Sequence, residues 1–321
     1  MQKNLVEIYL FRNGGDPIFE RAKKVNESCD KALQKEVNNI YWNDYKEFIK
    51  NLGYLKNYYK KGDTFREFSV DVLRQLGKGN VEEGTKIFNK TIKDMAKAMV
   101  EKITTYAEVE PKEVRNIIVV NTLYKPYMGF LFEEYIEELL QREGVFNIEE
   151  SKELDDKYKI DLLVNIKSYE QYKIGLQLKS YTFETIYRTY KEEYLKGNKK
   201  AINEGICRDV FYLLHSDNAE LLKAIKILNS KESICNTENI RLFDEPFTVV
   251  TEEENLIDEL LKVVFELYNK DNKKDDNSIF SFFKKYSEEG KREKEQNFID
   301  FKEKLYKTEK SLLSTPIDVS N

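Results

Sequence analysis

The chain has 321 residues, with 53 Lys plus Arg against 58 Asp plus Glu, so its formal net charge at pH 7 is −5. This charge argues against a nucleic-acid partner unless the cations gather in one patch, and the 40% hydrophobic content is enough for an ordinary core. With no apolar run of transmembrane length, no signal-peptide pattern and 3 widely spaced cysteines, we expect a cytoplasmic protein with reduced thiols and no membrane partner.

The first 125 residues are expected to be helical. Apolar residues recur at helical spacing over 30–60 and again over 82–106. Thr64 and Glu67 have the spacing of a capping box, which predicts that another helix begins there. Pro111 can begin a further helix that extends to about residue 120, because proline is favoured in the first helical turn.

A basic and aromatic stretch, Lys56–Lys61, lies at the end of the first of these helices. Such a stretch suits a DNA-contacting turn, with Lys60 and Lys61 as the candidate phosphate contacts. It suits a solvated helix end better, because basic residues are favoured near helix C-termini.

Residues 129–144 are expected to form a helix that Gly144 ends, because Phe132 and three later apolar residues recur at helical spacing. Glu133 follows Phe132 and flanks this apolar face, so its carboxylate is a candidate ligand for a buried site. Which of Glu133 and Glu134 faces that site stays open. We expect the other acidic side chains of this stretch to be solvated, namely those of Glu134, Glu137 and Glu138.

A β-hairpin is predicted next, from strand-like runs over 160–166 and 172–180 with a polar turn over 167–171. Asp161 and Lys179 stand inside these apolar runs. Burying an ionised side chain costs several kcal/mol unless it is paired or binds a metal, so a functional use is expected for both.

Side chains alternate along a strand, so Gln177 and Lys179 point the same way, and a suitable register brings Asp161 beside them. The Asp161 carboxylate, the Gln177 amide oxygen and the Leu178 main-chain carbonyl are oxygen ligands that suit Mg²⁺. Glu133 is the fourth candidate ligand. The Lys179 ammonium can position or deprotonate a water molecule at such a site.

The elements after the hairpin alternate between helix and strand. A polar helical stretch over 184–205 carries Arg188, Lys199 and Lys200, which are candidate contacts to a phosphate backbone. A strand over 209–214, a helix near 218–228, strands over 238–243 and 246–250, and a helix over 252–268 follow. This order predicts an α/β fold with a mixed central sheet flanked by helices.

From residue 269 the composition becomes highly charged, with apolar residues at helical spacing. We expect three parts: a helical region over 1–125 for DNA binding or dimerisation, a core over 126–268, and a charged helical C-terminal arm over 269–321. The arm either packs on its own core or contacts a second subunit. Its aromatic residues are Phe282, Phe283, Phe298 and Phe301.

The order of Glu133, Asp161 and Gln177-x-Lys179 resembles the nuclease superfamily that is named for its PD-(D/E)xK motif. The run from Gly129 to Tyr181 is similar to MjaI-like restriction endonucleases. Two positions depart from the pattern: Ile160 replaces the proline before the aspartate, and Gln177 replaces the usual acidic residue.

The resemblance implies a restriction-endonuclease-like core and a Mg²⁺-dependent endonuclease that hydrolyses double-stranded DNA, most simply a type II restriction enzyme working as a homodimer. It assigns Asp161, Gln177, Lys179 and Glu133 as catalytic residues, with Asp161, Glu133 and the Leu178 carbonyl at the metal. Two alternatives stay open, namely a repair or junction-cleaving nuclease of the same fold and a non-catalytic DNA-binding or scaffold protein.

Overall fold

The computed structural model describes residues 12–53, 55–104, 106, 108–179, 197–214, 240–242, 253–272 and 288–314. The chain divides into two compact units, Met1–Glu134 and Tyr135–Asn321. Among the described residues, no helix combines the length and apolar character that crossing a membrane requires.

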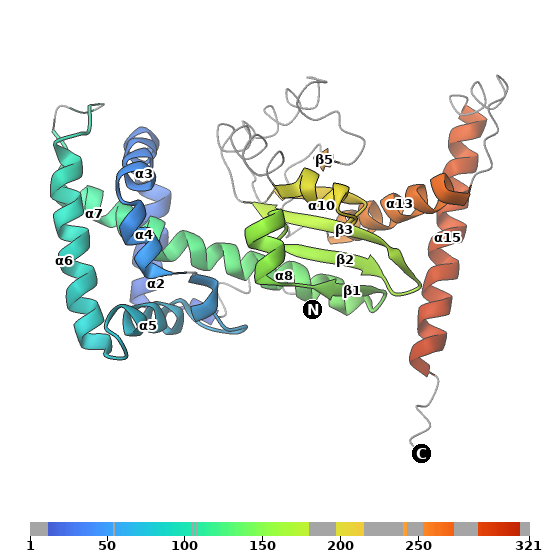
Figure 1. Ribbon diagram of the computed structural model, residues 1–321, viewed down its shortest axis with the longest axis horizontal. Coiled ribbons are helices and arrows are strands. Elements are labelled where there is room, and N and C mark those ends of the chain that lie inside the picture. The colour runs from blue at the N-terminus through green and yellow to red at the C-terminus, as the bar shows by residue number, and fades with distance from the viewer. Residues whose placement is uncertain are drawn as a thin grey trace, which may run out of the picture. The chain divides into compact units, whose positions relative to one another are not determined.

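The first unit is helical throughout its described part (Figure 1). Its apolar residues recur at helical spacing, and in α6 this places Phe88, Ile92 and Met99 on one buried face. That face packs against α5 and α7. The elements are α2 (Pro17–Ser28), α3 (Lys31–Asp44), α4 (Lys46–Leu52), the 3-10 turn η1 (Leu55–Tyr58), α5 (Phe65–Leu76), α6 (Val81–Val100) and α7 (Pro111–Val119).

Helix ends in this unit follow from local chemistry. The predicted capping box of Thr64 and Glu67 is confirmed, because both reciprocal hydrogen bonds are present at the start of α5. The helical period over 30–60 is present but interrupted. Gly53, with φ of 73°, caps α4 in a conformation that a residue with a side chain rarely adopts.

A continuous helical stretch runs from α7 through the π-helical segment η2 (Val120–Tyr124) into α8 (Lys125–Glu143). The boundary between the two units falls within α8. The predicted end of this helix at Gly144 is confirmed: its φ is 73° and its N–H donates to the Gln141 carbonyl at 3.0 Å.

The second unit contains one sheet with strand order β1-β2-β3-β4-β5. β1 (Phe146–Glu149) pairs antiparallel with β2 (Leu162–Ile166), and β2 pairs antiparallel with β3 (Tyr169–Lys179). β4 (Asp209–Leu214) lies parallel to β3, and the three-residue β5 (Ile240–Leu242) lies parallel to β4. Figure 1 shows β1, β2 and β3 as the largest part of this sheet.

The hairpin predicted from the sequence is β2 and β3, joined by a turn at Lys167 and Ser168. Four of the five β2 residues are buried, as expected for a near-continuous apolar run. β3 pairs with β2 as far as Leu176 and with β4 as far as Lys179. Beyond the β2 pairing, the main-chain N–H and the carboxylate of Asp161 bind the β3 main chain at Leu176 and Leu178.

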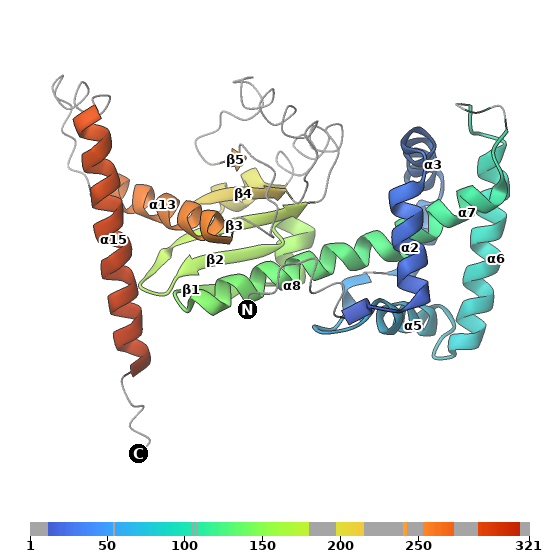
Figure 2. The same ribbon diagram turned by 180° about the vertical axis from the view of Figure 1, so that it is seen from behind.

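Two long helices, α13 (Glu253–Asn272) and α15 (Glu288–Ser314), complete the described part of the second unit (Figure 2). The Phe301 ring of α15 is only 8% exposed, and its centroid lies 5.5 Å from that of Tyr169 and 5.2 Å from that of Phe265. The described aromatic residues of the C-terminal arm thus pack within their own unit.

The predicted fold class, α/β with a mixed central sheet flanked by helices, is wrong for this chain. The protein is mainly helical, and its sheet is small: three antiparallel strands form most of it, and β4 and the three-residue β5 extend one edge. The physical reason is that β-prone apolar runs are few, whereas over most of the chain the apolar spacing is that of helices.

Several sequence-based expectations fall on residues outside the described ranges. These are the helical stretch over 184–196 with Arg188, the helix near 218–228, the strand over 246–250, and the arm residues Phe282 and Phe283.

Candidate functional site

Asp161 lies immediately before β2, and both its main chain and its side chain bind to β3. Its N–H donates to the Leu176 carbonyl at 2.9 Å, and its Oδ2 accepts the Leu178 N–H at 2.5 Å. The residue is 8% exposed. The carboxylate is therefore held against the main chain of β3 beside Gln177 and Leu178.

Gln177 is buried in β3, with 1% of its surface exposed. The register pairs Leu162 with Leu176, so the next position outward brings Gln177 level with Asp161. Within the described part of the chain, the Gln177 Oε1 has no hydrogen-bond partner. An unpaired buried acceptor costs about 1–3 kcal/mol, so binding of a ligand or a water molecule by this oxygen would be favourable.

The next two residues of β3 complete the predicted motif. Leu178 is 7% exposed and donates its N–H to Asp161, which leaves its main-chain carbonyl as a further oxygen of the site. Lys179 ends β3, and its main chain pairs with Leu214 of β4. The Lys179 side chain lies outside the described part of the structure.

Glu133 belongs to the first unit, where its carboxylate forms an ion pair with Lys56. The Glu133 side chain is 17% exposed and the Lys56 side chain 19% exposed, so the pair is largely withdrawn from solvent. Sequence reasoning missed this partner. It treated Lys56 as part of a basic stretch at a solvated helix end.

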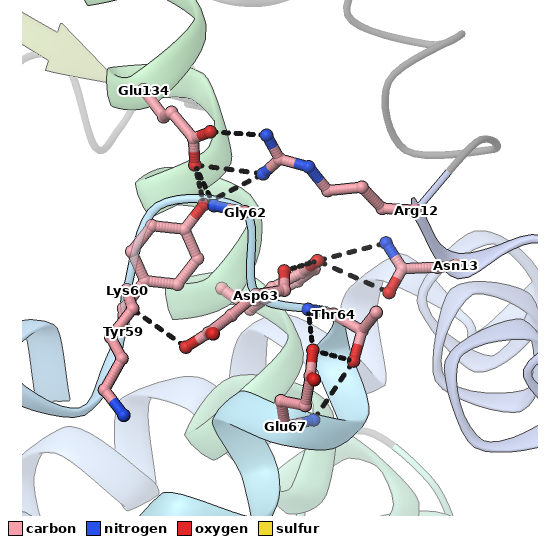
Figure 3. A network of polar contacts seen from close by, with 10 residues as sticks. Arg12, Asn13, Tyr59, Lys60, Gly62, Asp63, Thr64, Glu67 and Glu134 are labelled. Carbon is pink, nitrogen blue, oxygen red and sulfur yellow. Dashed lines mark hydrogen bonds and ion pairs between the residues drawn. The ribbon is translucent and has the colours of Figure 1, made fainter.

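Glu134 was expected to be solvated, and this expectation is wrong because the residue is 5% exposed. Figure 3 shows its carboxylate facing Arg12, which donates both guanidinium ends to it, and Tyr59, which donates its hydroxyl. The Gly62 N–H donates to it at 3.3 Å. Burial opposes ionisation, but these donors and the Arg12 charge outweigh it, so the pKa of Glu134 is lowered.

Magnesium suits the oxygen atoms that the hairpin presents. They are the Asp161 carboxylate, the Gln177 amide oxygen and the Leu178 carbonyl, and Mg²⁺ is commonly bound by one or two carboxylates plus waters and substrate phosphates. In the described ranges, no group of three or more His, Cys, Asp or Glu side chains gathers into a metal cage. The donors therefore fit a weakly held Mg²⁺ that a bound phosphate completes.

The lysines proposed to contact DNA lie on exposed turns and helices. Lys60 and Lys61 are exposed in the first unit, and the Lys60 Nζ lies 3.6 Å from the Asp71 Oδ2. Lys199 and Lys200 are exposed on α10 (Lys199–Asn203) in the second unit, the unit that holds Asp161. The Lys200 Nζ lies 3.8 Å from the Glu204 Oε1.

We expect Gln177→Glu to bind Mg²⁺ about tenfold more tightly than the natural chain, which corresponds to about 1.4 kcal/mol. The added carboxylate supplies charge for the metal. Without metal it is buried next to Asp161, so the thermal midpoint in EDTA should fall. Calorimetric Mg²⁺ titration and thermal unfolding with and without Mg²⁺ measure both effects.

Gln171→Glu is the matched control, because Gln171 is exposed on the same strand and its substitution adds the same charge. This control should change neither the Mg²⁺ affinity nor the thermal midpoint in EDTA appreciably. Equal Mg²⁺ affinity in Gln177→Glu and the natural chain would show that the orphaned Gln177 oxygen does not face a metal.

No family model matches this chain, and comparisons with curated proteins and with solved structures also find no match.

Proposed function

We propose that the protein is a Mg²⁺-dependent endonuclease that hydrolyses phosphodiester bonds of double-stranded DNA. One observation carries the proposal: the buried Gln177 oxygen, which has no hydrogen-bond partner among the described residues, belongs to a residue level with the buried Asp161. The order of motifs along the chain, which resembles PD-(D/E)xK nucleases, supports the same chemistry.

In this proposal Asp161, Gln177 and the Leu178 carbonyl hold the metal. The Leu178 N–H donates to one carboxylate oxygen of Asp161 and so fixes the orientation of this side chain at the site. A bound Mg²⁺ would polarise the scissile phosphate and stabilise the leaving oxygen. Lys179 positions the attacking water or accepts its proton.

DNA binding would depend on local cations, because the chain as a whole has a net charge of −5. Lys199 and Lys200 extend from the short helix that follows Asn198 in the unit of Asp161, and Lys60 and Lys61 supply a second exposed pair. In its narrowest version, our proposal is that the protein is a type II restriction enzyme.

The test is incubation of supercoiled plasmid with the full chain in Mg²⁺, in Ca²⁺ and in EDTA. Nicked and linear products in Mg²⁺ alone would support the proposal, and discrete fragments from DNA of known sequence would support a restriction enzyme. Cutting limited to branched DNA would instead favour a junction-cleaving nuclease. Binding without cutting under every metal condition would favour a non-catalytic DNA-binding protein.

We further expect a homodimer on DNA, because one site of this kind cuts one strand and a palindromic target matches two-fold protein symmetry. Phe301 packs within its own unit, so the described aromatic part of the C-terminal arm is a poor candidate for the interface. Light scattering with cognate DNA and Ca²⁺ should give two chains per duplex. One chain per duplex would contradict this expectation.

A further inference from the structure

Asn198 contacts the chain segment that leads into Asp161. It is fully buried, and its Nδ2 donates to the Tyr158 carbonyl at 3.0 Å and to the Lys159 carbonyl at 2.8 Å. These carbonyls stand at the end of the π-helical segment η3 (Leu154–Tyr158). Helix ends leave carbonyls without internal partners, so Asn198 satisfies groups that burial would otherwise penalise.

The chain makes an unusual turn at this point. Lys159 has φ of 56°, in the left-handed region that residues with side chains rarely adopt. The turn is closed by the Ile160 N–H, which donates to the Leu154 carbonyl at 3.1 Å. A conformation of this kind persists only where its surroundings hold it in place.

Two glycines allow the surroundings to approach closely. A Cβ on Gly197 would lie 2.7 Å from the Tyr158 carbonyl oxygen and 2.7 Å from the Lys159 Cγ. A Cβ on Gly175 would lie 2.9 Å from the Ile160 Cδ1. The two residues before Asp161 are therefore enclosed, by Gly197 beside Lys159 and by the β3 backbone beside Ile160.

We propose that Asn198, brought into contact by Gly197, is a positioning residue that holds Asp161 in its place at the site. This inference rests on the proposed nuclease function. A second contact also holds this turn in place. The Tyr158 hydroxyl donates to the Glu204 carboxylate at 2.6 Å, and Glu204 directly follows α10. The segment 197–204 thus fixes the turn that delivers the Asp161 carboxylate to the Leu178 N–H.

The test is Asn198→Asp, which keeps the side-chain shape but turns an oxygen toward two carbonyls that need a donor. We expect kcat for DNA cleavage to fall about 10–100-fold with little change in KM, as for other residues that orient a metal ligand. Because the Leu178 N–H donates to Asp161, its hydrogen exchange should also become about tenfold faster. That second readout does not depend on activity.

Leu305→Ala is the matched control, since Leu305 is 3% exposed in the same unit and its truncation lowers stability through a cavity alone. If Asn198→Asp does not fold, Asn198→Ser, which keeps one donor, should show smaller changes in the same direction. The inference would be overturned if Asn198→Asp changed kcat and the hydrogen exchange of the Leu178 N–H no more than Leu305→Ala does. Full cleavage by an Asp161 variant would instead overturn the proposed function. The hydrogen exchange of the Leu178 N–H would then still test whether Asn198 positions Asp161.

Discussion

Asp161→Asn is expected to lower the rate of Mg²⁺-dependent DNA cleavage about a thousandfold or more, which corresponds to about 4 kcal/mol of transition-state stabilisation. Asparagine has the same shape, and its oxygen can still accept the Leu178 N–H, so the fold of the hairpin should survive. The substitution removes the negative charge that the metal requires. Single-turnover cleavage of plasmid measures the effect.

Asp156→Asn is the control for this experiment. Asp156 is exposed in the segment that precedes the site, so the same change in charge occurs close by in the sequence without touching Leu178. Both variants should bind DNA in Ca²⁺ and unfold at nearly the temperature of the natural chain. Cleavage by folded Asp161→Asn at close to the natural rate would exclude Asp161 as a metal ligand and remove the basis of the proposed mechanism.

The sequence was sufficient to predict the hairpin because its signals are local. Two apolar, β-prone runs separated by polar residues predict β2 and β3. Their register could not be predicted, because the turn is shorter than expected and the pairing shifts between Val164 and Ile166. Asp161 and Lys179 stood out there because charged side chains inside apolar runs need a reason. That Gln177 Oε1 lacks a partner among the described residues became visible only in three dimensions.

Other features could not be predicted because their partners are distant in sequence. Glu134 looks like its solvated neighbours, and it is buried because Arg12, 122 residues earlier, binds it. Asn198 binds carbonyls 39 and 40 residues earlier, and it lies in a stretch that the sequence predicts only as a polar helix. The fold class failed for another reason: the expectation made the sheet the centre of the fold, whereas helices make up most of the described chain.

The buried ion pair of Arg12 and Glu134 is the basis of the last prediction, which concerns stability. Glu134→Gln keeps the side-chain shape but leaves the Arg12 guanidinium, whose side chain is 16% exposed, without its counter-charge. Removing one partner of a buried pair is strongly destabilising, so we expect the free energy of unfolding to fall by about 3 kcal/mol at neutral pH. Trp42, the single tryptophan, lies in the same unit and reports its unfolding in urea by fluorescence.

The pH dependence of this loss follows from the lowered pKa of Glu134, whose ordinary value is 4.5. A carboxyl with a lowered folded-state pKa adds stability above its unfolded-state pKa, and that stability is lost as the pH falls through the folded-state pKa. The difference between the natural chain and Glu134→Gln should therefore be full at neutral pH and should shrink progressively below pH 4.5. Glu138→Gln, an exposed change on the same helix, should show neither effect. A pH-independent difference would mean that the Glu134 contacts stabilise the unit through shape and packing rather than through charge.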